Sequence, residues 1–225
     1  DPGARGQAYA QKLHEEGVHV LVSPGNPGNE HFAESTDVPA TDVAGQVDMA
    51  IGCGVDLTIV CSDDALKNGL VDALQAEGKL AYGPTREQAR VEWDRTYGKQ
   101  IAKDLGIPIG AYAEFSEPTT ALEYAQTLSG WPLFVKDNHL AQGKGATECA
   151  TLQDLEAVVA QKFGSYVLEE FIAGPEASHH AFCDGNTHLS IPVLARDHKQ
   201  LLDGGKGPMT GGMGVIAGLH YSPEE

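Results

Sequence analysis

The chain has 225 residues, 41% of them hydrophobic, which is enough to bury a core as one large or two small domains. Its 15 basic and 32 acidic residues give a formal net charge of −17, which disfavours binding of nucleic acid or anionic membranes. No apolar run approaches the roughly 20 residues of a transmembrane helix. We therefore expect a cytoplasmic protein with no nucleic-acid or membrane partner, which holds any anion through local cations and backbone N–H groups.

Cysteine, histidine and glycine usage narrows the class further. The four cysteines are scattered without a CxxC pair, so we expect reduced, mostly buried thiols and no disulfide framework. His179 and His180 are adjacent and would face opposite sides of a strand, so no metal site is expected within this chain. Glycine is over-represented, with 27 residues against an average of about 7%, and the surplus is expected in special turns and ligand loops.

The first 86 residues alternate between helical and extended patterns. We predict a helix through about residue 14, a strand over 18–22, a helix over 42–51, a strand over 57–61, a helix over 64–77 and a strand over 80–82. This order is typical of an α/β, Rossmann-like domain with a parallel sheet, whose ligands bind at the carboxyl ends of the strands. Such a domain usually opens with a strand ahead of its first loop, so residues 1–86 are expected to lack their first strand.

The rest of the chain predicts a linker followed by α+β units. Thr85 and Gln88 have the spacing of a capping box, so a helix is expected from residue 86 and a second over 94–105, within a linker over 87–111. Strands over 112–115, 133–136, 147–150 and 166–171, with helices over 119–128 and 152–163, form a unit over 112–173. Strands over 177–183 and 188–195 open a last unit over 174–225, which is expected to be incomplete.

Three groups of residues carry candidate chemistry, and the first is basic. Lys136 ends an apolar strand, and Lys144 lies between Gly143 and Gly145 in a loop where backbone N–H groups could converge on phosphate oxygens. The loop is not a Walker A motif, because Gly145 stands where Ser or Thr would follow the lysine. A surface hairpin with incidental lysines is the alternative.

The second group is acidic and the third is rich in glycine. An apolar strand ending in Glu169-Glu170 could offer its edge to a purine and a carboxylate to ribose; a solvated strand end is the alternative. Seven glycines between residues 204 and 218 cannot support a regular helix or strand, so we predict a mobile loop that closes over an anion. A floppy terminus is the alternative for this segment.

Taken together, these groups resemble the ATP-grasp superfamily, and more closely its phosphoribosylamine–glycine ligases. The segments follow the family's order along the whole chain: Pro2-Gly-Ala-Arg-Gly6, Pro24-Gly-Asn-Pro-Gly28, Tyr82-Gly-Pro-Thr85, Val135-Lys136, Leu140-Ala-Gln-Gly-Lys-Gly145, Glu169-Glu-Phe-Ile-Ala-Gly-Pro-Glu-Ala-Ser178, Asp197-His-Lys199 and Gly207-Pro-Met-Thr-Gly-Gly-Met-Gly214. The resemblance implies a Rossmann-like N-terminal domain followed by ATP-grasp subdomains.

The resemblance also implies a reaction and a set of roles. ATP would phosphorylate the carboxylate of glycine, and 5-phosphoribosylamine would attack the acyl phosphate, with Mg²⁺ or Mn²⁺ present. The implied ATP contacts are Arg95, Lys136, Gly143, Lys144, Gly145, Glu169, Glu170, Phe171, Ile172 and Glu176, where Glu170–Ile172 read adenine through their backbone and Glu176 holds the ribose. The implied phosphoribosylamine contacts are Gly3, Asn26, Asp63, Asp197, Lys199, Gly211, Gly212 and Gly214. No catalytic residue is assigned, and a monomer or homodimer is expected.

Several positions depart from the family pattern. Asp94-Arg95 stands for its Ser-Lys, Asn138-His139 for its Asp-Gly, Met209 for an Asn, and Asp63 for a Glu. The family's Mg²⁺ ligands and glycine-binding groups would lie beyond residue 225, so we expect this chain alone to be inactive. Two alternatives remain open at this point: a nucleotide-binding relative without catalysis, and an ATP-grasp ligase for another amine and acid.

Overall fold

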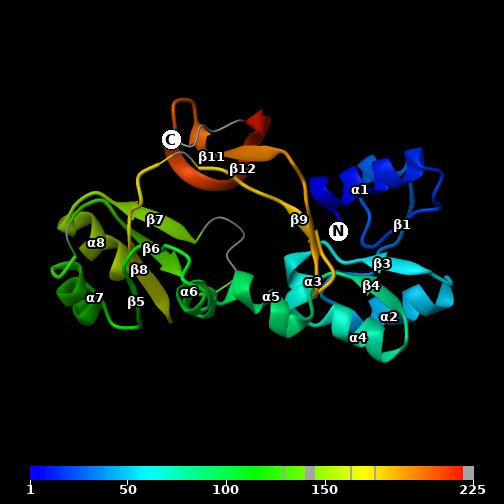
Figure 1. Cartoon of the computed structure of the whole chain (residues 1–225), viewed down its shortest axis with the longest axis horizontal. Helices are drawn as coiled ribbons and strands as arrows, with labels where there is room; N and C mark the ends of the chain where they lie inside the picture. The colour runs from blue at the N-terminus through cyan, green and yellow to red at the C-terminus, as the bar shows by residue number, and fades with distance from the viewer. Residues whose placement is uncertain (129, 140–144, 163, 175, 220–225) are drawn as a thin grey trace. The chain divides into compact units, whose positions relative to one another are not determined.

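The structure is a computed structural model that describes residues 1–128, 130–139, 145–162, 164–174 and 176–219. It contains two compact units, Asp1–Trp93 and Asp94–Glu225, hereafter unit 1 and unit 2 (Figure 1). None of the helices in the described part of the chain has the length and hydropathy to cross a bilayer. The α/β fold class predicted from the sequence is confirmed in the strand pairings of both units.

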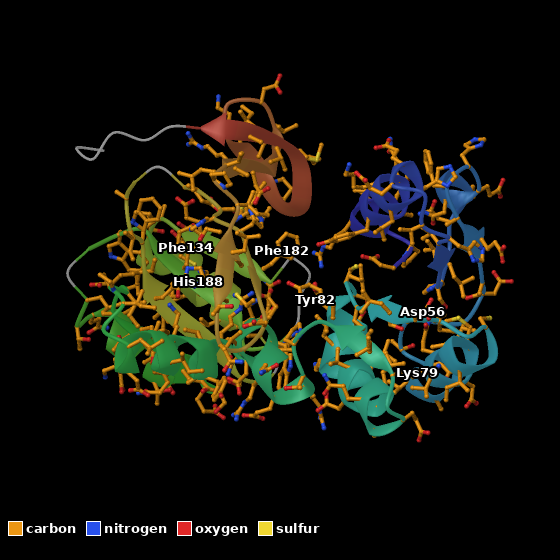
Figure 2. All side chains as sticks on the ribbon, turned by 45° about the vertical axis from the view of Figure 1, so that its right-hand side comes forward. Asp56, Lys79, Tyr82, Phe134, Phe182 and His188 are labelled. Carbon is orange, nitrogen blue, oxygen red and sulfur yellow. The ribbon has the colours of Figure 1, made fainter. Side chains whose placement is uncertain are left out.

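Unit 1 alternates helices with short parallel strands. Its elements are α1 (Ala4–Glu15), β1 (Leu21–Val22), the 3-10 helix η1 (Pro27–Asn29), β2 (Glu34–Ser35), α2 (Val43–Gly52), β3 (Leu57–Ile59), α3 (Asp63–Lys67), α4 (Leu70–Ala76), β4 (Leu80–Tyr82) and α5 (Arg86–Trp93). Strand β1 pairs with β2 and β3 with β4, both in parallel, so the described sheet consists of two separate pairs. In Figure 2, Asp56 and Lys79 mark the starts of β3 and β4, and Tyr82 marks the end of β4.

An apolar groove of about 520 Å³ is lined by strands of both pairs. Leu21 of β1 and Ile59 of β3 contribute to its walls, together with Ala10 of α1 and Ala50 of α2. The helices pack on a core that is buried from solvent and comprises Val47, Ala50, Val60, Ala65, Leu70, Val71 and Leu74. The predicted helix over 64–77 is two helices, because Gly69 adopts a left-handed conformation with φ of 82° and begins α4.

Unit 2 contains an antiparallel sheet covered by two helices. The strands β5 (Tyr112–Phe115), β6 (Leu133–Asp137), β7 (Ala146–Cys149) and β8 (Tyr166–Glu170) are ordered β5-β8-β6-β7. Helices α7 (Pro118–Ala125) and α8 (Leu152–Val159) cover one face of this sheet (Figure 1), while α6 (Arg95–Asp104) precedes it in the chain. The core between sheet and helices contains Ala121, Ala125, Leu133, Val135, Cys149, Leu155, Val159, Tyr166 and Leu168.

The period of two along a strand divides the side chains of this sheet between its faces. Leu133 and Val135 of β6 and Leu168 of β8 enter the core beneath α7 and α8. Lys136 of β6 and Glu169 of β8 alternate with them, and so project from the opposite face. The apolar residues therefore fix the register that brings these two charged side chains to one surface.

The glycine-rich segment forms a strand, which corrects the prediction of a loop. After β9 (Ala181–Cys183) and β10 (His188–Ser190), strand β11 (Leu194–Leu202) pairs antiparallel with β12 (Lys206–Leu219). Glycine does not prevent this pairing, because the ladder uses backbone groups only. The register shifts between His198 and Gln200, where residues 210–213 of β12 bulge opposite Lys199.

The expectation of mostly buried cysteines is wrong. Cys149 is fully buried in the core of unit 2 and Cys61 is half-buried, but Cys53 and Cys183 are exposed. Cys53 caps the C-terminus of α2, and Cys183 ends β9, a strand whose three residues are all exposed. All four are free thiols.

Candidate functional site

A buried carboxylate shared by two lysines lies on the face of the unit 2 sheet opposite α7 and α8. Glu169 of β8 has a side chain only 8% exposed, and it pairs with Lys136 of β6 and with Lys99 of α6. The strand register places Lys136 opposite Val167, one step diagonally from Glu169. The two ammonium groups belong to different elements and meet at one carboxylate.

The charge balance of this cluster favours the ionised carboxylate. Burial alone would raise the pKa of Glu169, but hydrogen bonds and charge from Lys136 and then Lys99 outweigh it, so the pKa is lowered. Two lysines and one carboxylate leave one net positive charge, and Glu169 acts as the counter-ion that keeps both lysines in place. Anionic oxygens could take over that role, which is the chemistry expected of a polyphosphate site.

Aromatic rings support both lysines. The Nζ atom of Lys99 lies 5.0 Å from the ring centroid of Tyr112, and that of Lys136 lies 5.8 Å from the ring of Phe134. Phe134, labelled in Figure 2, also stacks on Phe171 with ring centroids 5.8 Å apart. The rings restrict the ammonium groups without neutralising them, so the positive charge stays available to a ligand.

Lys99 is the site residue that the sequence analysis missed. It follows Arg95 by four residues, so the two lie on the same face of α6. The four-residue spacing from Arg95, a predicted ATP contact, was the sequence signal that could have identified Lys99. Arg95 itself is tied to the end of β6, where its Nε donates to the carbonyl oxygen of Asp137 at 2.8 Å.

Glu170, which ends β8, bonds to Ala111 through both its backbone and its side chain. The N–H of Glu170 donates to the carbonyl of Ala111 at 3.0 Å, and the Glu170 carboxylate accepts from the N–H of Ala111. Phe171 and Ile172, also predicted to read adenine, follow β8 and are 49% and 66% exposed. Their role stays a prediction.

Two residues predicted for different ligands form an ion pair. Glu176, predicted to hold the ribose of ATP, pairs with Lys199, predicted to contact phosphoribosylamine. Lys199 lies in β11 opposite the bulge, and its carbonyl accepts a hydrogen bond from Thr210 Oγ1 at 2.8 Å.

The other predicted residues of this segment lie along the same ladder. Asp197 pairs with Val215, and Gly214 pairs with His198. Gly211 and Gly212 belong to the bulge itself, where the N–H of Gly212 reaches Thr210 Oγ1. The structure thus groups Asp197, Lys199 and the three glycines on β11 and β12.

The predicted substrate residues of unit 1 gather at the carboxyl ends of β1 and β3. Gly3 caps α1, and Asn26 caps η1 while its Nδ2 donates to the carbonyl of Pro2 at 2.6 Å. Asp63 begins α3 and pairs with Arg5 at 3.3 Å. Arg5 also donates to the carbonyl of Cys61 at 2.6 Å, so the start of α1 is held against the end of β3.

The basic loop is only partly described. Gly143 and Lys144 lie outside the described residues, so their predicted phosphate contacts stay predictions. Gly145 is buried, and its carbonyl accepts a hydrogen bond from the N–H of Asp137 at 2.8 Å. The loop therefore returns to the sheet beside Lys136.

The donor set fits a nucleotide better than it fits a resident metal. Lys99, Lys136 and Arg95 are cations of the kind that bind phosphate oxygens, and Phe171 and Ile172 are exposed apolar side chains. Within the described ranges, no group of three His, Cys, Asp or Glu side chains is placed to hold a metal ion. We assign no metal ligand in this part of the chain.

Comparison with known proteins gives the family. Residues 1–92 match the family model of the phosphoribosylglycinamide synthetase N domain, and residues 93–225 match that of the phosphoribosylglycinamide synthetase ATP-grasp (A) domain. The chain belongs to the phosphoribosylglycinamide synthetase family. The resemblance noted in the sequence is thereby confirmed.

Relatives and solved structures agree with this assignment. The chain is 37% identical over 231 residues to the phosphoribosylamine–glycine ligase of Caulobacter vibrioides and 36% identical over 234 residues to that of Streptococcus pneumoniae. The alignments cover 98% and 99% of this chain but 52% and 55% of those proteins, so the chain spans about half the length of these curated relatives.

The structural likeness extends over both units. The phosphoribosylamine–glycine ligase structure from Thermotoga maritima matches with a TM-score of 0.79 and 24% identity, covering 98% of this chain and 55% of that one. An Aspergillus clavatus carboxyaminoimidazole ribonucleotide synthase complexed with ATP matches with a TM-score of 0.68 and 14% identity, covering 87% of this chain and 55% of that one. At these identities the likeness shows the fold.

Proposed function

We propose that this chain provides the ATP-binding cations and the phosphoribosylamine-binding residues of an ATP-dependent ligase that joins glycine to 5-phosphoribosylamine in purine biosynthesis. The observation that carries the proposal is the cluster of Lys99, Lys136 and Glu169 within the segment that matches the ATP-grasp domain. The names of the relatives supply the substrates.

The reaction requires a site that binds several negatively charged groups close together. A glycine carboxylate oxygen attacks the γ-phosphorus of ATP and ADP leaves, and then the amine nitrogen attacks the acyl carbon and phosphate leaves with its bridging oxygen. Phosphoryl transfer depends on positioning and charge neutralisation more than on covalent catalysis. Lys99 and Lys136 supply that neutralisation from two elements, and a divalent cation such as Mg²⁺ would accompany the ATP phosphates.

The position of the remaining residues supports the roles that we propose for them. In unit 1, Gly3, Asn26 and Asp63 lie at the carboxyl ends of β1 and β3, where parallel sheets bind ligands. We assign them to phosphoribosylamine. Lys199 and Asp197 on β11 complete the proposed contacts with phosphoribosylamine. We further propose that the protein is located in the cytoplasm.

Two measurements test the proposal. Calorimetry of the 225-residue chain with MgATP is expected to show binding that Lys136→Ala weakens, because a charge-assisted phosphate contact is lost, and no binding by the wild-type chain would refute the nucleotide site. In the complete protein, ADP release is expected to require both glycine and phosphoribosylamine. ATP binding without turnover would favour a non-catalytic relative, and release with another amine or acid would favour a different ligase.

A further inference from the structure

Asn138 connects three elements of unit 2 through its side-chain amide. It directly follows β6, and its Oδ1 accepts hydrogen bonds from the backbone N–H groups of Arg95 at 2.9 Å and Thr96 at 3.3 Å. Its Nδ2 lies 2.9 Å from Glu114 Oε1 of β5 and 3.2 Å from Ser165 Oγ, just before β8. One residue at the end of β6 thus joins the start of α6 to β5 and to the start of β8.

The first turn of α6 depends on this residue. The first N–H groups of a helix have no partner inside the helix. Asp94, the N-cap, accepts from the N–H of Tyr97 at 3.0 Å, whereas Arg95 and Thr96 use the oxygen of Asn138. The N–H groups at the start of α6 are therefore bonded partly by Asp94 and partly by Asn138, which lies 43 residues from Arg95.

Glu114 closes the network and holds the amide in one orientation. Its carboxylate accepts hydrogen bonds from Ser165, from Thr96 Oγ1 at 2.7 Å and from Asn138. Hydrogen bonding by Ser165, followed by Thr96 and Asn138, lowers the pKa of Glu114 against the opposing effects of slight desolvation and of the nearby Asp94. An ionised Glu114 accepts hydrogen bonds only, so the NH₂ group of Asn138 faces it and the oxygen faces α6.

We propose that Asn138 is a positioning residue that sets the place of α6 and thereby presents Lys99 to the phosphate-binding face of the sheet. Lys99 begins the second turn of the helix that Asn138 caps, and its ammonium reaches Glu169 beside Lys136. The backbone of Arg95, on the same helix face, bonds to Asn138 directly. The expected effect of Asn138 on ATP affinity rests on the proposed function, in which Lys99 neutralises charge on the phosphates.

The experiment measures Lys99 and nucleotide binding separately in the full 225-residue chain. Lysine acylation followed by mass spectrometry reports the exposure of Lys99, with Lys12 of unit 1 as an internal reference, and calorimetry with MgATP reports affinity. Asn138→Ala removes both arms of the amide, and we expect about tenfold faster acylation of Lys99 and about tenfold weaker ATP binding. Gln100→Ala, on the same helix with its amide bonded to Asp104, is the matched control and is expected to change neither.

A second pair of variants keeps the test valid if Asn138→Ala does not fold. Asn138→Asp retains an oxygen for α6 but places a carboxylate against Glu114, so Lys99 acylation should increase. Combining it with Glu114→Gln restores a hydrogen-bond donor between the two positions, so Lys99 acylation and MgATP affinity should both return toward wild type. A general loss of stability would not be reversed by the second substitution.

Each result has a distinct meaning. Lys99 acylation that is unchanged in Asn138→Ala and Asn138→Asp overturns the inference. So does wild-type ATP affinity in a variant whose Lys99 has become reactive, because the position of Lys99 would then have no effect on the phosphate-binding face. A wild-type chain that binds no MgATP, with Lys99 still responding to Asn138, refutes the proposed function but supports the positioning of α6.

Discussion

Replacement of Glu169 by Gln tests the charge cluster directly. The Glu169 side chain is 8% exposed, and the partner lysines are 21% and 29% exposed, so the variant leaves two ammonium groups close together with little solvent. Removing one partner of a buried ionic group costs about 3–5 kcal/mol. The partial exposure of the lysines lets them turn toward water, and we therefore expect a loss of about 3 kcal/mol in the free energy of unfolding of unit 2.

Denaturant titration followed by circular dichroism measures this loss, with Glu16→Gln as the control. Glu16 pairs with Lys12 on the surface of α1, where both side chains are more than half exposed. Such a pair contributes only about 0.3–0.5 kcal/mol. Equal stability of Glu169→Gln and wild type would refute the reasoning, as would an equal loss in both variants.

The difference in free energy of unfolding between wild type and Glu169→Gln should depend on pH in a defined direction. Because the folded-state pKa of Glu169 is lowered, its ionised form contributes fully above its ordinary pKa of 4.5 and is lost as pH falls through the lower folded value. The difference in free energy of unfolding between wild type and Glu169→Gln should therefore be constant from neutral pH to about pH 5 and should become smaller below about pH 4.5. A gap that widens on acidification would show that the carboxylate is not stabilised by the lysines.

Three further predictions concern other parts of the chain. Lys144→Ala should weaken MgATP binding by about 1.5–3 kcal/mol in calorimetry, and unchanged affinity would remove Lys144 from the phosphate site. Burial, followed by the nearby acidic groups, raises the pKa of the Cys149 thiol to about 11, so mass spectrometry after alkylation at pH 8 should find Cys53 modified and Cys149 intact. Thr151→Ala removes the capping box shared with Asp154 and should cost about 1 kcal/mol of unfolding free energy, whereas no change would show that α8 needs no cap.

The fold was most predictable where local signals and burial agree. Short apolar runs predicted the strands of the unit 2 sheet, and β5 has the bounds expected from sequence. The Thr85–Gln88 capping box is confirmed by reciprocal hydrogen bonds at 2.9 and 3.4 Å. Errors occurred where backbone geometry overrides the side-chain pattern, as at Gly69, or where paired backbone groups tolerate many glycines, as in β12.

The candidate site was predicted as a set of residues, but its contacts were not. Lys136 and Glu169 were both assigned to ATP, yet their ion pair depends on the register between β6 and β8, which the sequence does not encode locally. Asn138 was noted only as a departure from the family pattern. Its bonds to Arg95 and Glu114 join residues that are 43 and 24 positions apart, so only the assembled sheet reveals them.

The groove in unit 1 bears on how the protein behaves in solution. Its walls combine apolar side chains with the edges of β1 and β3, and strand edges beside apolar surface readily accept extended segments from other molecules. The net charge of −17 opposes such contact through mutual repulsion between molecules. Salt screens that repulsion, so self-association of this chain should increase with ionic strength, and its acidic composition then acts as a protection against aggregation.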